Sequence, residues 1–169
     1  MIRVAMAVLL VCFLVAGALV VRINTTPSMP RGLYILDPLH EPARGDLVSL
    51  CAPGAWAALA RERGYLGEGL CPEGTKPLLK RLVGIPGDVV AMEPEGVLVN
   101  DVARPRSAPH GHDRSGRPLP APQSGGTIPS GFGLALSEHP DGFDARYFGW
   151  VPLDAMTRVV PLLTLNSME

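Results

Sequence analysis

The sequence predicts a mostly β domain of antiparallel strands, carried by one N-terminal transmembrane helix. Two observations on composition predict the strands. The 169 residues include 19 glycines and 18 prolines, about a fifth of the chain against roughly 12% on average. Both residues interrupt helices, so a helix bundle is excluded and short strands joined by turns are favoured. The apolar content of 47% excludes disorder over the whole length.

The third observation is an uncharged apolar run at the N-terminus, from Val4 to Val21. As a helix it would measure about 27 Å, close to the hydrocarbon thickness of roughly 30 Å. It has no polar face, which predicts a membrane anchor over residues 1–23. The alternative is a cleaved signal peptide, supported by the A-x-A pattern at residues 16–18. Either reading places residues 24–169 outside the cytoplasm.

The length and charge of the chain limit its possible functions. A chain of 169 residues allows one ordinary domain. The net charge of −1 argues against a nucleic-acid partner and against a polybasic lipid-surface protein.

The elements follow from apolar runs between turn residues. Apolar residues at helical spacing predict one helix at 55–63. Two runs flanking Glu93–Gly96 predict a β-hairpin. Residues 103–131 are rich in Pro, Gly, Ser, Arg and His, which predicts a loop insertion. The expected strands are 32–36, 46–50, 78–83, 89–92, 97–99, 132–136 and 147–151.

Two cysteines lie in the exported part, Cys51 and Cys71. A pair in this setting suggests a disulfide that closes a loop of about 20 residues and stabilises by roughly 3 kcal/mol. The alternative is two unrelated buried thiols. No metal site is expected, because the chain has no C-x-x-C and because His110 and His112 lack partners at zinc spacing.

Only two of the 15 basic residues are lysines, and one of them is a candidate base. Strand alternation places Lys80 on the same face as Leu78 and Leu82. Desolvation there would lower its pKa and make a neutral amine available near pH 7. The alternative is that Lys80 reaches solvent from an edge strand.

A candidate nucleophile follows the apolar run. Ser28 lies between Pro27 and Pro30, which restrict the backbone on both sides. A rigid serine suits the nucleophile of a Ser–Lys dyad. The alternative is a polar turn after an anchor.

Four segments resemble the motifs of type I signal peptidases, the S26 family of serine peptidases. They occur in the family's order and span residues 26–152. The short anchor, the compact length and the cysteine loop resemble the family's conjugative-transfer branch. The segments are Thr26–Pro30, Arg44–Val48, Lys80–Asp88 and Asp144–Pro152.

The resemblance implies a signal-peptidase-like antiparallel β domain and assigns catalytic roles. Ser28 would attack the substrate carbonyl, and neutral Lys80 would take its proton and later activate water. The backbone N–H of Ser28 and the Thr26 hydroxyl would form the oxyanion hole. Asp144 is the third catalytic candidate, or a purely structural partner of Arg146.

Further residues are expected to have structural roles by the same resemblance. Arg81 and Arg146 would brace the site, Gly87 would form the turn after the lysine strand, and Asp88 would brace that turn. One position departs from the family. Many members have a serine two residues before the last-motif aspartate, where it orients the lysine, and here that residue is Gly142. Ser137 and His139 are the candidates to compensate.

The expected function is a membrane-anchored endopeptidase that processes an exported precursor, the conjugative pilin precursor, without a cofactor. Its expected partners are this precursor, the membrane and the conjugative transfer apparatus. Its expected location is the bacterial inner membrane, with the catalytic domain facing the periplasm. The alternatives are a general type I signal peptidase, a non-catalytic assembly factor of the transfer channel, and an exported binder of metal or peptidoglycan working through His110 and His112.

Overall fold

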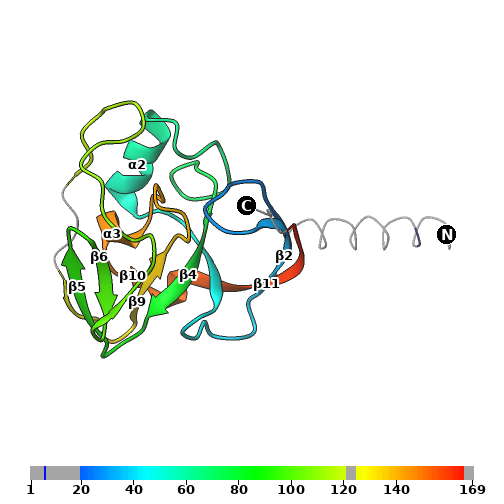
Figure 1. Ribbon diagram of the computed structural model, residues 1–169. Helices are drawn as coiled ribbons and strands as arrows, with labels where there is room; N and C mark the ends of the chain where they lie inside the picture. The colour runs from blue at the N-terminus through cyan, green and yellow to red at the C-terminus, as the bar shows by residue number, and fades with distance from the viewer. Residues whose placement is uncertain (1–5, 7–19, 121–124, 166–169) are drawn as a thin grey trace.

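In the computed structural model, which describes residues 6, 20–120 and 125–165, the chain folds into two antiparallel sheets (Figure 1). The larger sheet has the strand order β1-β2-β11-β3-β4-β9-β10, and the smaller has the order β7-β6-β5-β8. The strands of the larger sheet are β1 (Val21–Asn24), β2 (Arg31–Asp37), β11 (Met156–Leu165), β3 (Leu47–Leu50), β4 (Leu78–Gly84), β9 (Phe132–Leu136) and β10 (Val151–Pro152). Those of the smaller sheet are β7 (Val102–Ala103), β6 (Gly96–Val99), β5 (Val89–Glu93) and β8 (Gly126–Thr127).

Strand β4 shows why these residues form a sheet with a buried face. Its side chains alternate between buried and partly exposed along its whole length, as a strand with one core face requires. Leu82 on the buried face packs in the main core with Val97 of β6 and Leu134 of β9. The core therefore lies between the two sheets, and it holds β4 in the middle of the molecule.

The strand β11 joins the two halves of the larger sheet. It pairs with β2 on one side and with β3 on the other. The pairing of β2 with β11 requires a glycine at position 32. A Cβ at this position would lie 2.0 Å from the carbonyl oxygen of Leu163, and the residue has a φ of +156°. Figure 1 shows β2 and β11 side by side at one end of the molecule, away from β5 and β6. The last described strand, β11, thus fixes the position of the first two, β1 and β2.

Helix α2 (Gly54–Glu62) lies beside the sheet and buries Ala57 and Ala60. Its Trp56 contacts Phe143 and Phe148, with ring centroids 6.2 and 6.4 Å apart. The two phenylalanines belong to the segment around helix α3 (Ala145–Phe148). The aromatic cluster therefore holds the segment that contains Asp144 against the core.

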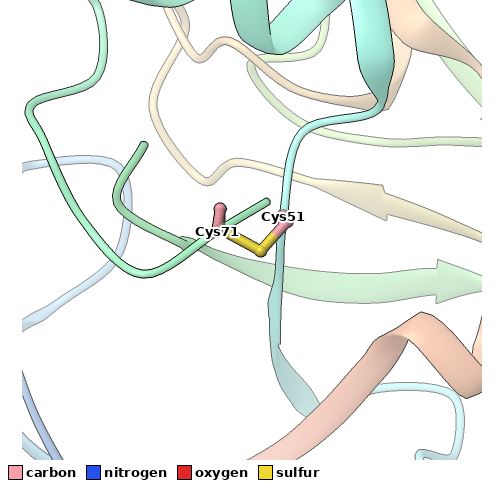
Figure 2. The surroundings of a disulfide bond; sticks show 2 residues. All are labelled: Cys51 and Cys71. Carbon is pink, nitrogen blue, oxygen red and sulfur yellow. A yellow bond between two sulfur atoms is a disulfide. The ribbon is translucent and has the colours of Figure 1, made fainter. Parts of the chain in front are cut away.

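The expected disulfide between Cys51 and Cys71 is present (Figure 2). Cys51 directly follows β3, and the closed loop of 20 residues contains α2. Closing a loop of this size stabilises the fold by about 3 kcal/mol in the chain-entropy picture. The bond thus fastens α2 to the strand that pairs with β4.

Several predicted elements differ in the structure. The expected strand at 147–151 is wrong, because Asp144 caps a short helix and β10 begins at Val151. The described parts of the predicted loop, residues 103–120 and 125–131, are mostly irregular, but β8 within them pairs with β5. Strands β1 and β11 were not predicted.

The predicted anchor falls largely on residues 7–19, which lie outside the described residues. Among the residues that are described, no helix combines the length and the apolar character needed to cross a membrane. Val21, counted in the predicted run, begins β1.

Candidate active site

Ser28 lies in the tight loop between β1 and β2. The loop residues Thr26 to Pro30 include two prolines, and the buried side chain of Met29 packs in a small cluster with Tyr34. The Ser28 hydroxyl is 2.9 Å from the Thr26 hydroxyl. Both hydroxyls therefore lie on the same side of a restrained loop.

Residues that follow the loop in sequence bind two of its carbonyl groups. The carbonyl of Ser28 accepts hydrogen bonds from the backbone N–H of Glu138 and from the Ser137 hydroxyl, both at 3.0 Å. The Tyr34 hydroxyl donates to the carbonyl of Pro30. These contacts hold the backbone of the candidate nucleophile against the segment that follows β9.

Lys80 lies on the buried face of β4, with only 2% of its surface exposed. Burial lowers its pKa from 10.5 to about 8, because the charged ammonium loses its water. The carboxylate of Asp144 raises that pKa in part, and the guanidinium of Arg146 lowers it further. The predicted burial on the face of Leu78 and Leu82 is confirmed.

Ser137 connects the surroundings of Lys80 with those of Ser28. Strands β4 and β9 are paired at Arg81 and Leu136. Lys80 precedes this pair on β4, and Ser137 follows it directly after the end of β9. The buried Ser137 also donates to the carbonyl of Ser28, so the segment that follows β9 connects the strand pair of β4 and β9 with the Ser28 loop.

Asp144 and Arg146 form a fully buried ion pair. The guanidinium donates to both carboxylate oxygens, from Nε at 2.9 Å and from Nη2 at 3.0 Å. The backbone N–H of Ser137 also donates to Asp144, at 2.7 Å. Arg146 reaches the carbonyls of Pro140 and Ala108 as well, at 2.6 and 3.1 Å. The pair therefore fastens both the 137–142 turn and the start of the long loop.

The remaining predicted residues surround the same strand. Arg81 donates to Glu138 at 2.6 Å and to the carbonyl of Gly45 at 2.8 Å. Asp88 accepts from the N–H of Ile85 and from Arg44, at 2.8 and 2.7 Å.

These contacts explain the charge state of Asp88 and the shape of its turn. The hydrogen bond from Arg44 is the main cause that lowers the pKa of Asp88 to about 2. Gly87 has φ +87°, which suits a turn glycine.

The structure gives a physical reason for the glycine at position 142. A Cβ built on Gly142 would lie 2.2 Å from the Cβ of Ser137 and 2.5 Å from its hydroxyl oxygen. The Ser137 side chain therefore occupies the space that a residue at 142 would need. Of the two candidates to compensate for Gly142, Ser137 fills this space, whereas His139 lies further along the turn, where its ring accepts from the N–H of Asp141.

Two residues at this site were missed by sequence reasoning. Asn24 and Tyr34 both bind carbonyls of the Ser28 loop. Neither belongs to a recognisable motif, and the continuous apolar run of β2 has no alternation that would single out Tyr34 as its buried position. The Nε2 of His110, considered as a metal ligand, lies 3.3 Å from the Oδ1 of Asp141 at the surface.

Comparison with known proteins defines the class of this protein. The family model described as signal peptidase, peptidase S26, matches residues 1–162. The chain belongs to this family.

Two relatives carry names from DNA transfer. The "Conjugal transfer protein TraF" of Agrobacterium tumefaciens (strain 15955) is 42% identical over 133 residues, which cover 78% of this chain and 74% of that protein. The "Plasmid transfer protein TraF" of Escherichia coli is 38% identical over 154 residues, covering 88% of this chain and 84% of that protein. These matches agree with the predicted conjugative-transfer branch.

A solved structure was also matched, that of a signal peptidase I from Enterococcus faecalis V583. It is 21% identical, covers 75% of this chain and 98% of its own, and superposes with a TM-score of 0.40.

Proposed function

We propose that this chain is a membrane-anchored serine endopeptidase with Ser28 as nucleophile and Lys80 as general base. Its substrate in this proposal is an exported precursor used in conjugal transfer, the pilin precursor. The observation that carries the proposal is the buried Lys80, whose pKa of about 8 leaves a usable fraction of neutral amine. The conjugal and plasmid transfer names of the relatives support the choice of substrate.

The proposed reaction passes through an acyl-enzyme. The Ser28 oxygen attacks the carbonyl carbon of the scissile peptide, and the Ser28 proton moves to the Nζ of Lys80. The leaving amine then takes this proton as the peptide bond breaks. Lys80, neutral again, removes a proton from water, and the water oxygen attacks the ester carbonyl. As the ester bond breaks, Lys80 gives this proton to the Ser28 oxygen, which releases the new carboxyl end and restores the free enzyme.

Charge in this reaction is stabilised at two places. The oxyanion would accept hydrogen bonds from the Ser28 N–H and from the Thr26 hydroxyl. The Asp144 carboxylate favours the ammonium that forms on Lys80, as its effect on the pKa of Lys80 indicates. Asp144 thus acts on the base through its charge, while its hydrogen bonds to Arg146 hold it in place.

We place the enzyme at the bacterial inner membrane, with residues 1–23 as anchor and the peptidase domain in the periplasm. The uncharged run of Val4 to Val21 supports the anchor. The disulfide supports an oxidising compartment. Exposed apolar side chains occur on β1, where the predicted span ends, and on β11, which lies on the other side of β2 in the same sheet. These include Ile23, Leu162 and Leu165, each more than 60% exposed.

The proposal is tested by cleavage of candidate pilin precursors with membranes carrying wild type, Ser28→Ala or Lys80→Ala. We expect wild type to cleave and both variants to lose at least about 10³-fold in rate. Ser130→Ala and Lys76→Ala are matched controls, since Ser130 also follows a proline and Lys76 is the other lysine, and both are exposed.

The other outcomes decide between the alternatives. Cleavage of general secretory precursors but not of pilin would identify a general signal peptidase. Equal cleavage by all variants would place the nucleophile elsewhere. Accumulation of wild-type protein without cleavage of any precursor would favour an assembly factor that keeps only the fold.

A further inference from the structure

Asn24, the last residue of β1, holds the Ser28 loop through its side-chain amide. The Nδ2 group donates to three backbone carbonyls, those of Thr26 at 3.1 Å, Met29 at 2.9 Å and Pro30 at 3.0 Å. One half-buried side chain thus closes the loop from Thr26 to Pro30.

The other end of the same amide faces Thr26. The Oδ1 atom of Asn24 accepts from the Thr26 backbone N–H at 3.2 Å and from the Thr26 hydroxyl at 2.8 Å. The orientation of the amide is fixed by chemistry, because a backbone N–H can only donate and carbonyls can only accept. Turning the amide over would place Nδ2 against an N–H and Oδ1 against three carbonyls.

This orientation sets the direction of the hydroxyl contact at Ser28. A threonine hydroxyl has one proton, and that of Thr26 points to an amide oxygen, which has no proton to give. In the 2.9 Å contact between Thr26 and Ser28, the donor must therefore be Ser28. Both hydrogen bonds therefore have the same direction: Ser28 donates to Thr26, and Thr26 donates to Asn24.

We infer that Asn24 is a positioning residue that acts on Ser28 through the Thr26 hydroxyl. This inference rests on the proposed function. In the free enzyme, the Ser28 hydroxyl donates its hydrogen bond to the Thr26 oxygen, and the Thr26 hydroxyl donates to the Oδ1 of Asn24. When substrate binds, two hydroxyl rotations start the reaction. The Ser28 proton turns to Lys80, and the Thr26 proton turns from Asn24 to the oxyanion. No proton is gained or lost in this exchange.

Steady-state cleavage of a precursor that wild type cleaves tests the inference by a double-mutant cycle. We expect Asn24→Ala to lower kcat about tenfold with KM unchanged within twofold, since the inferred role is to position Ser28 and not to bind substrate. Thr26→Val should lower kcat about a hundredfold. The double variant should lose about as much as Thr26→Val alone, because Asn24 acts through the group already removed.

Two checks separate positioning from a structural role. Thr25→Val makes the same hydroxyl-to-methyl change at the exposed neighbouring residue and should leave kcat unchanged. The melting temperature of Asn24→Ala should stay close to that of wild type, because Tyr34, Ser137 and the N–H of Glu138 still hold the loop.

The results that overturn the inference differ from those that overturn the proposed function. An unchanged kcat in Asn24→Ala, or a double variant whose loss is the product of the two single losses, overturns the role of Asn24 alone. Cleavage by Ser28→Ala as fast as by wild type overturns the proposed function, and the inference with it.

Discussion

Lys80 is the residue at which folding and the proposed chemistry conflict most directly. Its ammonium lies in a strand face shared with Leu78 and Leu82, where water cannot solvate it. The Asp144 carboxylate compensates part of this charge, but Arg146 neutralises much of that carboxylate. Together, burial and these two charges disfavour the protonated form of Lys80. A lowered lysine pKa is the property that a general base needs near neutral pH.

The pH dependence of cleavage should follow from this balance. The neutral form of Lys80 increases as pH rises through about 8. We therefore expect kcat/KM to rise about tenfold per pH unit below that value and to level off above it. Initial rates of precursor cleavage between about pH 6 and 10 measure the profile. A midpoint near the usual lysine pKa would contradict the burial of the amine.

Replacing Lys80 should stabilise the fold at neutral pH. Its pKa is about 8 when folded and 10.5 when exposed, which corresponds to about 3 kcal/mol of unfavourable free energy below pH 8. The unfolded chain binds the extra proton between these two values, so the stability of wild type rises with pH across this window.

Lys80→Met should accordingly raise the free energy of unfolding at pH 7 by up to about 3 kcal/mol and lose this advantage as pH approaches 10.5. Urea denaturation at both pH values measures it, with Lys76→Met as the exposed control. A gain of equal size at both pH values would show that packing, not charge, is responsible.

At the scale of single residues, the sequence was informative where a side chain's type is unusual for its position. A lysine on an apolar strand face and a serine between prolines could be singled out without a structure. Asn24 and Tyr34 could not, because they bind backbone carbonyls, and every residue has one. Ser137 contacts Ser28 across 109 residues of sequence, a separation that no local pattern reports.

At the scale of elements, the turn from Ser137 to Gly142 makes a sharp prediction. Gly142→Ala would place a methyl group 2.2 Å from the Ser137 side chain. We expect a loss of about 1–3 kcal/mol in stability from this overpacking.

The matched variants make the cause testable by thermal melting. Adding Ser137→Gly to Gly142→Ala should recover part of the loss, since the conflicting side chain is removed. Gly111→Ala, where no atom lies within 4 Å of the new methyl group, should melt like wild type. A double variant less stable than Gly142→Ala alone would contradict this account.

Elements were predictable where one face is buried and alternation is regular. Strand β4 meets this condition, whereas the β5–β6 hairpin was predictable from the turn residues between its two apolar runs. Strand β11 does not meet the condition, because its residues beyond Val159 are exposed and Pro161 interrupts the pattern. The proline is tolerated because the pairing with β2 shifts register there. Helix α3 was mistaken for a strand because its four residues are too short to show helical spacing.

At the scale of the whole molecule, the proposed anchor can be tested on the mature protein. We expect the chain to stay in the membrane fraction after alkaline extraction and to keep residues 1–23, as intact-mass measurement would reveal. Deleting residues 1–19 should move the protein to the soluble fraction. A mature chain that begins after Ala18 would instead support the cleaved signal peptide.

Strand β11 also determines when the proposed enzyme can begin to work. It is the last strand of the described chain, yet it lies between β2, which follows the Ser28 loop, and β3, which pairs with the strand of Lys80. A ribosome makes the chain from its N-terminus, so nucleophile and base both emerge before the strand that joins their halves of the sheet. If the chain acts as we propose, it therefore stays inactive during synthesis until β11 has been made and has paired with both β2 and β3.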